Sequence, residues 1–357
     1  MCIYNATTSS IGECYMKILL FGDAHFCKRS SILNKFGTKY SMRIENQIQT
    51  FEWIKSQAIA NNCGMVIGLG DLFDASQLND MEITAAKELP FADIPTYLIV
   101  GNHESSVQDL SFNSTKLLES PNCTAIVEPF SFYIDDTEVC LLPYIVESER
   151  KQLAEYFPST KTSNKRVILS HNDIKGISYG PVVSPVGFAI EDIEANCDLY
   201  INAHIHNGQQ ITDKIYNIGN ITGQNFSEDA LVYAHKIIIL DTDSLSCEFI
   251  ENPYAYNFYK LQIDCETDIY SLDMLKNQAV LSIKCEQTLV DKVKDKLNTL
   301  DNVVEHRIIL TKKAETCSND SLDLDLSVDH LARFVECCKA NIECTALLDE
   351  ELSEVCK

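Results

Sequence analysis

Five apolar runs, each ending in a polar residue, constrain this sequence more than any other feature. The run at residues 66–69 ends in Gly70 and Asp71, and Val, Ile and Leu before a glycine are typical of a buried strand. Glycine also lets the backbone turn sharply. We therefore expect Asp71 just beyond the carboxyl end of a strand, where open α/β sheets place their functional groups.

Four other runs, at residues 17–21, 96–100, 166–169 and 198–202, end in the same way. Five of the eight histidines stand at such ends. The polar residues that follow these runs are Asp23, His25, Asn102, His103, His171, His204 and His206. Five unrelated caps and turns would not concentrate histidine in this way, so we expect the strand ends to meet at one site.

The residue types at these ends predict a centre with two divalent metal ions. Asp71 can bridge two ions through its two oxygens, and the mixed nitrogen and oxygen ligands favour Mn²⁺, Fe²⁺ or Zn²⁺ over Mg²⁺ or Ca²⁺. The lack of cysteine at these ends argues against a structural zinc site. Two metals roughly 3.5–4 Å apart clamp a phosphoryl group, so the pattern predicts phosphoester hydrolysis. His103 is the candidate for stabilising charge or protonating the leaving oxygen, the alternative being a further ligand or a packed turn residue.

Composition limits the class of protein. With 357 residues the chain is long enough for two domains, and no apolar run approaches the length of a membrane span. Residues 1–15 do not resemble a signal peptide, which predicts a disordered extension, with Met16 as an alternative start, and a cytoplasmic protein (host cytoplasm for a viral chain). Fifteen cysteines without a Cys-x-x-Cys pair predict reduced thiols.

Alternating strand and helix patterns predict a mixed α/β fold over residues 16–251. Apolar residues at helical spacing predict helices at 44–54 and 80–89, between strands, so we expect a sheet covered by helices. Hairpins predicted at 130–143 and 236–251 indicate a second sheet rich in antiparallel strands. A sandwich of two sheets flanked by helices accommodates both patterns.

A second, smaller α/β domain is predicted after the break at Pro253 and is assigned to residues 252–315. Its pattern is strand, helix, strand, helix, strand, with strands at 279–285 and 304–310 and a helix at 287–300. Beyond it, residues 316–357 predict an acidic tail of two short amphipathic helices, too small to form a core. Such a tail docks on its own chain or on a partner through apolar residues, here Val328, Leu331, Phe334 and Val335.

Charge is distributed unevenly along the chain. The net charge of −23 argues against non-specific nucleic-acid binding by the bare chain, although bound divalent cations would reverse the local sign. Residues 26–44 contain cations and no acid. This stretch is either a solvated loop or a contact with a phosphate backbone beside the metals, made by Lys28, Arg29, Lys35, Lys39 and Arg43.

The strand-end motifs resemble those of the calcineurin-like metallophosphoesterases over residues 16–240. The matching stretches are Asp23-x-His25, Gly70-Asp71-x-x-Asp74, Gly101-Asn102-His103-Glu104, His171 and His204-x-His206. The resemblance implies a four-layer α/β/β/α sandwich with a two-metal site and His103 as the catalytic histidine. It also implies that one ion is held by Asp23, His25, Asp71 and His206, and the other by Asp71, Asn102, His171 and His204.

Within this superfamily the chain is most similar to the SbcD-type nucleases. Ala75-Ser76 follow the second Asp, where the Ser/Thr phosphatases carry Arg-Gly. Residues 213–220 and the small domain resemble the corresponding segment and the DNA-capping domain of these nucleases, and the tail resembles the segment that docks on an SMC-like ABC ATPase of the SbcC type. The layout is most similar to bacteriophage recombination endonuclease subunits. Glu104, Ala203 and Asn220-Ile221 depart from the usual Asp, Gly and Ser/Thr-Pro, which bears on substrate placement but removes no ligand.

The resemblance implies a nuclease subunit for DNA repair or recombination. Expected properties are Mn²⁺ dependence, 3′-to-5′ exonuclease action on duplex ends, endonuclease action on single strands, an ATPase partner and a homodimer through the nuclease domain. One alternative is a phosphatase or small phosphodiesterase, which Glu104 and the acidic composition favour. The other is a scaffold whose site is vestigial, which the intact set of ligands argues against.

Overall fold

The computed structural model describes most of the chain up to Thr311. The chain divides into two compact units, Met1–Thr311 and Lys312–Lys357, and every described residue belongs to the first. The described residues are 16–27, 37–106, 109–158, 165–179, 182–228 and 230–311. The predicted N-terminal extension and the predicted acidic tail lie outside them.

The first sheet carries three of the predicted strand ends and has the order β16-β15-β1-β2-β3-β6. Its strands are β1 (Lys17–Phe21), β2 (Cys63–Gly68), β3 (Thr96–Ile99), β6 (Cys123–Ile126), β15 (Lys236–Asp241) and β16 (Cys247–Glu251). Strands β1, β2, β3 and β6 run parallel, and the hairpin of β15 and β16 pairs antiparallel with β1. The carboxyl ends of the parallel strands therefore share one edge of the sheet.

The second sheet has the order β13-β14-β12-β9-β8-β7. Its strands are β7 (Phe130–Ile134), β8 (Thr137–Leu142), β9 (Lys165–Ser170), β12 (Leu199–Asn202), β13 (Gln209–Gln210) and β14 (Ile215–Asn217). The four central strands are parallel, and only β7 and β13 pair antiparallel. The expectation of a sheet rich in antiparallel strands is therefore wrong. Crossovers through α3 (Leu153–Tyr156) and α4 (Ile190–Asn196) let the chain re-enter the sheet in the same direction.

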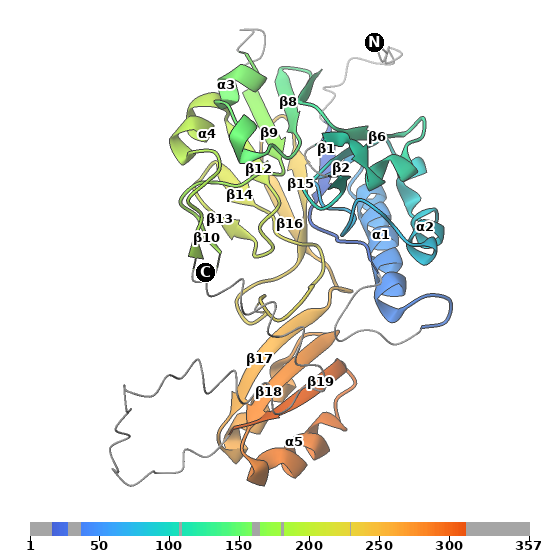
Figure 1. The fold of residues 1–357 in the computed structure, drawn as a ribbon, viewed down its shortest axis with the longest axis vertical. Coiled ribbons are helices and arrows are strands. Elements are labelled where there is room, and N and C mark those ends of the chain that lie inside the picture. Colours follow the sequence, from blue (N-terminus) through green and yellow to red (C-terminus); the bar gives the residue numbers. More distant parts are fainter. Residues whose placement is uncertain are drawn as a thin grey trace, which may run out of the picture. The chain divides into compact units, whose positions relative to one another are not determined.

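Helices cover the outer face of each sheet, so the molecule has four layers. Helices α1 (Met42–Ala60) and α2 (Asp80–Ala86) lie on the first sheet, and α3 and α4 lie on the second (Figure 1). Phe51 of α1 packs in one apolar cluster with Leu19 of β1. A second cluster joins the two sheets through residues such as Leu20 and Val139. The predicted four-layer α/β/β/α fold is confirmed.

Polar caps define where the two helices on the first sheet begin. The Ser41 hydroxyl accepts a hydrogen bond from the Ile44 N–H at 3.3 Å, and Asn79 and Glu82 form a reciprocal capping box before α2. No helix among the described residues is both long and apolar enough to cross a membrane. The shorter elements are η1 (Pro90–Ala92), β4 (Ser105–Ser106), β5 (Asp109–Asn113), η2 (Ser114–Leu118), η3 (Glu147–Glu149), β10 (Ser178–Tyr179) and β11 (Val182–Val183).

A third sheet follows the sandwich and consists of the parallel strands β17 (Asn257–Ile263), β18 (Ala279–Cys285) and β19 (Val303–Leu310). One face of it is covered by η4 (Glu266–Met274), η5 (Gln287–Leu289) and α5 (Val290–Leu297). The predicted helix between β17 and β18 is thus a 3₁₀ helix, and the α-helix between β18 and β19 is shorter than predicted. Because the third sheet belongs to the same compact unit as the sandwich, its assignment as a separate capping domain stays a prediction.

Candidate metal centre

The predicted strand ends meet where the two sheets face each other. Asp23, Asp71 and Asn102 follow β1, β2 and β3 of the first sheet, and His171 and His204 follow β9 and β12 of the second. The backbone φ is 44° at Asp23, 48° at Asp71 and 88° at His204. Residues other than glycine adopt this left-handed conformation only at a cost, and such strained positions cluster at functional sites.

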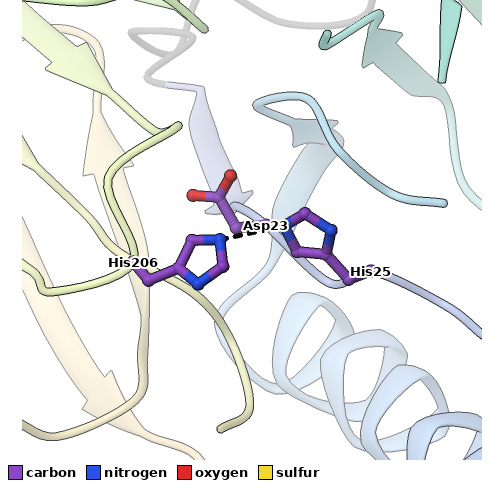
Figure 2. A group of neighbouring side chains, drawn as sticks. All are labelled: Asp23, His25 and His206. Carbon is purple, nitrogen blue, oxygen red and sulfur yellow. Dashed lines mark hydrogen bonds between the residues drawn. The ribbon is translucent and has the colours of Figure 1, made fainter. Parts of the chain in front are cut away.

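Asp23, His25 and His206 form the first ligand group. Their ligating atoms lie within 4.8 Å of one another, and the Nε2 atoms of His25 and His206 are 3.1 Å apart. Figure 2 shows that Asp23 and His25 come from the chain after β1, whereas His206 approaches from a separate loop. Two imidazole nitrogens at this distance must share either a proton or a cation, because two lone pairs facing each other would repel. The donor set therefore fits a divalent metal.

Asp71, His171 and His204 form the second ligand group, again with ligating atoms within 4.8 Å. The Asn102 Oδ1 atom lies 3.2 Å from Nε2 of His171 and 3.0 Å from Nδ1 of His204. Nδ1 of His171 lies 2.8 Å from the carbonyl oxygen of Leu69. Because that carbonyl can only accept, it fixes the proton on Nδ1 in the neutral ring and leaves Nε2 free to act as a ligand.

Asp71 lies between the two groups. Its Oδ2 atom is 3.2 Å from Nε2 of His171 and 3.8 Å from Nε2 of His25. Burial alone would raise the pKa of Asp71, but the charge and hydrogen bond of His171 hold that pKa well below its usual range. Burial lowers the pKa of His171, and the Asp71 carboxylate outweighs this effect and raises it to about 9. The carboxylate thus stays ionised and is placed to bridge two cations.

His103 lies at the open side of this centre. Its side chain is 44% exposed, and its backbone N–H donates to Oδ1 of Asp71 at 3.0 Å. A hydrogen bond with Asp74 is the main cause that raises the pKa of His103 to about 9. Asp74 also lies 3.1 Å from Nδ1 of His25. The sequence pattern contained Asp74 without predicting a role for it, and the structure places it between two imidazoles.

Glu228 was missed by the sequence analysis. It is only 3% exposed, and its Oε1 atom lies 3.2 Å from Nδ1 of His206. The same carboxylate accepts hydrogen bonds from Nδ2 of Asn220 at 2.9 Å and from the Gln224 N–H at 3.1 Å. Its only signal in the sequence is a pair of adjacent acids, Glu228 and Asp229, in a stretch that begins 22 residues beyond His206. A carboxylate on the second nitrogen of a metal-ligating histidine is a common arrangement that fixes the ring.

Glu104 braces the loop that carries Asn102 and His103. It is fully buried and accepts hydrogen bonds from the backbone N–H groups of Gly101 at 2.8 Å and Phe73 at 3.1 Å. Burial raises its pKa to about 7. Gly101 must be a glycine, because a Cβ atom there would lie 2.1 Å from Oδ1 of Asp71. Glu104, which stands where the family usually has Asp, therefore serves to hold the backbone of this loop.

The predicted phosphate contacts are only partly described. Lys28, Arg29 and Lys35 lie outside the described residues, as do Val328, Leu331, Phe334 and Val335 of the predicted tail. Lys39 is exposed and forms an ion pair with Glu88. Arg43 is 1% exposed and donates to the carbonyl of Gly223 and the side chain of Gln224. The prediction that Arg43 contacts a phosphate backbone is thus wrong, because α1 turns its guanidinium into the interior.

The sequence model of the calcineurin-like phosphoesterases matches residues 16–208, which is more than half of the chain. The chain therefore belongs to this family. The superfamily depends on two metal ions, and the two ligand groups supply candidate ligands for them. No curated protein matches the sequence.

The solved structures that match this chain are distant in sequence. A dimetal phosphatase from Danio rerio is 14% identical with a TM-score of 0.38, and the match covers 66% of this chain and 99% of that one. An archaeal phosphodiesterase is 15% identical with a TM-score of 0.35 and the same two coverages. The nuclease MPE of Pseudomonas putida is 15% identical with a TM-score of 0.27, covering 62% and 84%. At these values the structures do not choose between the three activities.

Proposed function

We propose that this phosphoesterase is a DNA nuclease of the SbcD type that uses two divalent ions, with Mn²⁺ preferred. The observation that carries the proposal is the third sheet, which displays cations on its open face and packs on the chain segment that holds Glu228. We name residues 218–235, without Asp229, the linking segment.

The open face of the third sheet is basic although the chain is acidic. The register places Lys260, Lys284 and Arg307 on the same face, opposite η4 and α5, together with one acid, Glu305. All three are exposed, and Lys260 and Lys284 have no ion-pair partner within 4.0 Å among the described residues. Such a face suits a phosphate backbone, whose binding is dominated by Lys and Arg contacts.

The same face contacts the linking segment. The Arg307 guanidinium lies 4.4 Å from the centroid of the Phe226 ring, and Phe226 packs edge-on against Phe258 of β17. Phe226 is two residues from Glu228, which contacts His206. A nucleic-acid strand on the open face would therefore lie close to the metal centre, as a nuclease requires.

The residues of the site have separable roles in this proposal. Two divalent ions, held by the two ligand groups with Asp71 between them, would polarise the phosphoryl oxygens and activate a water for attack on phosphorus. His103 is exposed and is kept protonated at neutral pH by Asp74, so it can donate a proton to the leaving oxygen. Asp74 positions His103, and Glu228 positions His206.

The alternative function is a phosphatase or small phosphodiesterase. The net charge of −23 favours a small substrate over a polyanion. Glu104 no longer distinguishes the two functions, because it is buried and bonded to backbone N–H groups. The basic open face of the third sheet favours DNA.

The decisive experiment compares two substrates in Mn²⁺: linear duplex DNA and p-nitrophenyl phosphate. We expect DNA cleavage that the His103→Ala variant loses by about 10²- to 10⁴-fold, since it lacks the proton donor, while both ions remain bound. His306→Ala removes an exposed histidine of β19 and serves as the control with unchanged activity. Hydrolysis of the monoester without DNA cleavage would establish the alternative, and undiminished cleavage by His103→Ala would overturn its assigned role.

A further inference from the structure

A cavity of about 640 Å³ lies directly beside the metal centre and has no role in the function proposed so far. Two of its lining residues touch metal-ligand candidates. The hydroxyl of Ser105 donates to the carbonyl of Asn102 at 3.3 Å, and the ring of Tyr144 lies 5.9 Å from that of His204. The cavity therefore lies next to Asn102 and His204, with Ser105 and Tyr144 between it and these residues.

The wall that carries Tyr144 is fixed to the same strand end as His171. The N–H of Ile145 donates to Oδ1 of Asn172 at 2.9 Å, and the Arg150 guanidinium donates to the same atom at 3.1 Å. Arg150 also donates to the carbonyl of Ile145 at 3.1 Å and stacks 4.7 Å over the ring of Phe188. Since Asn172 follows His171, these bonds hold the wall and the metal centre in one geometry.

The lining of the cavity suits a flat, uncharged ring rather than a phosphate. Leu110 and Tyr144 are half-buried and provide apolar and aromatic walls. At the rim, the carboxylates of Asp109, Glu128 and Glu149 outnumber the single ammonium group, that of Lys151. Carboxylates repel phosphate, but they accept hydrogen bonds from ring amino groups. The volume falls in the range of cavities that bind small molecules.

We propose that this cavity binds the nucleoside of the nucleotide whose phosphate lies at the metals, with its base against Tyr144 and further phosphates kept out by the acidic rim. The proposal rests on the proposed function, because it assumes a nucleotide phosphate at the centre. It makes the enzyme one that accepts an unstacked terminal nucleotide, since a base inside a duplex cannot enter the cavity and an internal nucleotide carries a second phosphate.

Calorimetric titration of the full-length, Mn²⁺-loaded protein with 2′-deoxyadenosine 5′-monophosphate and with inorganic phosphate tests the proposal without requiring turnover. We expect the nucleotide to bind about 5- to 150-fold more tightly than phosphate, the range for one base stacked on an aromatic ring. Tyr144→Ala should bring this ratio close to one, and Tyr144→Phe should preserve it, because stacking needs the ring and not the hydroxyl.

A second variant is needed because Tyr144→Ala can also disturb His204, whose ring lies beside that of Tyr144. Leu110→Trp puts a larger ring at a second lining position and should also reduce the preference, whereas Phe112→Ala removes an exposed side chain of the same strand outside the cavity and should not. Equal binding of nucleotide and phosphate by the wild type, or a ratio unchanged in both cavity variants, overturns the proposal.

The experiments can overturn either proposal while leaving the other in place. DNA cleavage by a protein without nucleotide preference keeps the nuclease function and overturns the cavity. A nucleotide preference that both cavity variants lose, in a protein that cleaves no DNA, keeps the cavity and overturns the nuclease.

Discussion

At the scale of single residues, the candidate metal ligands depend on neighbouring groups that are not ligand candidates for the same ion. His206 has its Nδ1 atom 3.2 Å from the buried carboxylate of Glu228. Burial would raise the pKa of Glu228, but the hydrogen bond with His206 lowers it overall, so the carboxylate stays charged. The same pair raises the pKa of His206 against the effect of its burial. Orientation of the imidazole and charge at the site are therefore set by one contact.

Glu228→Gln should weaken Mn²⁺ binding about 10- to 100-fold, the usual effect of losing a carboxylate behind a metal-ligating histidine. Titration calorimetry with Mn²⁺ measures this directly. Glu82→Gln is the matched control, because Glu82 is also buried but caps α2. If the two variants lose affinity equally, the effect is one of general stability and the positioning role is refuted.

At the scale of elements, the third sheet offers a test of the proposed substrate. Lys260→Gln and Lys284→Gln should each weaken DNA binding and reduce the slope of log affinity against log salt by about 0.9 for duplex DNA, since each removes one phosphate contact. Fluorescence anisotropy at several salt concentrations measures both quantities.

Lys292→Gln provides the control for this series. Lys292 lies on α5, on the covered side of the sheet, and pairs with Glu266. An identical salt slope in all four proteins would show that DNA does not contact the open face.

The strands that end at the site could be predicted because each is an apolar run with a small residue and a polar residue at its end. This information is local, and it located Asp23, Asp71 and Asn102 at one sheet edge. The direction of pairing in the second sheet could not be predicted in this way. It depends on where α3 and α4 return the chain, and the local hairpin of β7 and β8 was a misleading guide to the whole sheet.

The sequence patterns also did not indicate which polar residues are buried. Arg43 belongs to a cationic stretch, but it shares a helix face with Gln47 and Thr50, and that face is buried. Glu228 contacts His206 through space, from a segment with no periodic pattern. Both errors concern contacts between parts of the chain that are distant in sequence.

At the scale of the whole molecule, metal binding should contribute to stability. The buried site collects the carboxylates of Asp23 and Asp71, and ions that bind only the folded state stabilise it. At free Mn²⁺ a hundredfold above the dissociation constant, each site adds about 2.7 kcal/mol to the free energy of unfolding. Scanning calorimetry with and without a chelator should show a lower melting temperature in the chelator. An unchanged melting temperature would mean that the ligand groups bind no ion.

The predicted association with an SMC-like ATPase can be tested by truncation. Deletion of residues 316–357 should leave Mn²⁺-dependent cleavage in place, because every proposed ligand precedes this segment, and should abolish association with the ATPase. Co-elution on size-exclusion chromatography measures the association. In the full-length chain, Leu331→Glu should weaken it while leaving cleavage intact. A truncated chain that still co-elutes would refute the assignment of the tail.

The linking segment connects the third sheet to one ligand group and not to the other. The N–H of Gly223 donates to the carbonyl of Tyr256 at 3.0 Å, and that of Ala230 donates to Phe258 at 3.1 Å, so the start of β17 is bonded to the stretch that holds Glu228. Among the described residues, no comparable bond joins the third sheet to His171 or His204. If DNA binds the open face as proposed, we therefore expect a force on the third sheet to act first on an ion held by His206, and we expect this ion to exchange faster than the other.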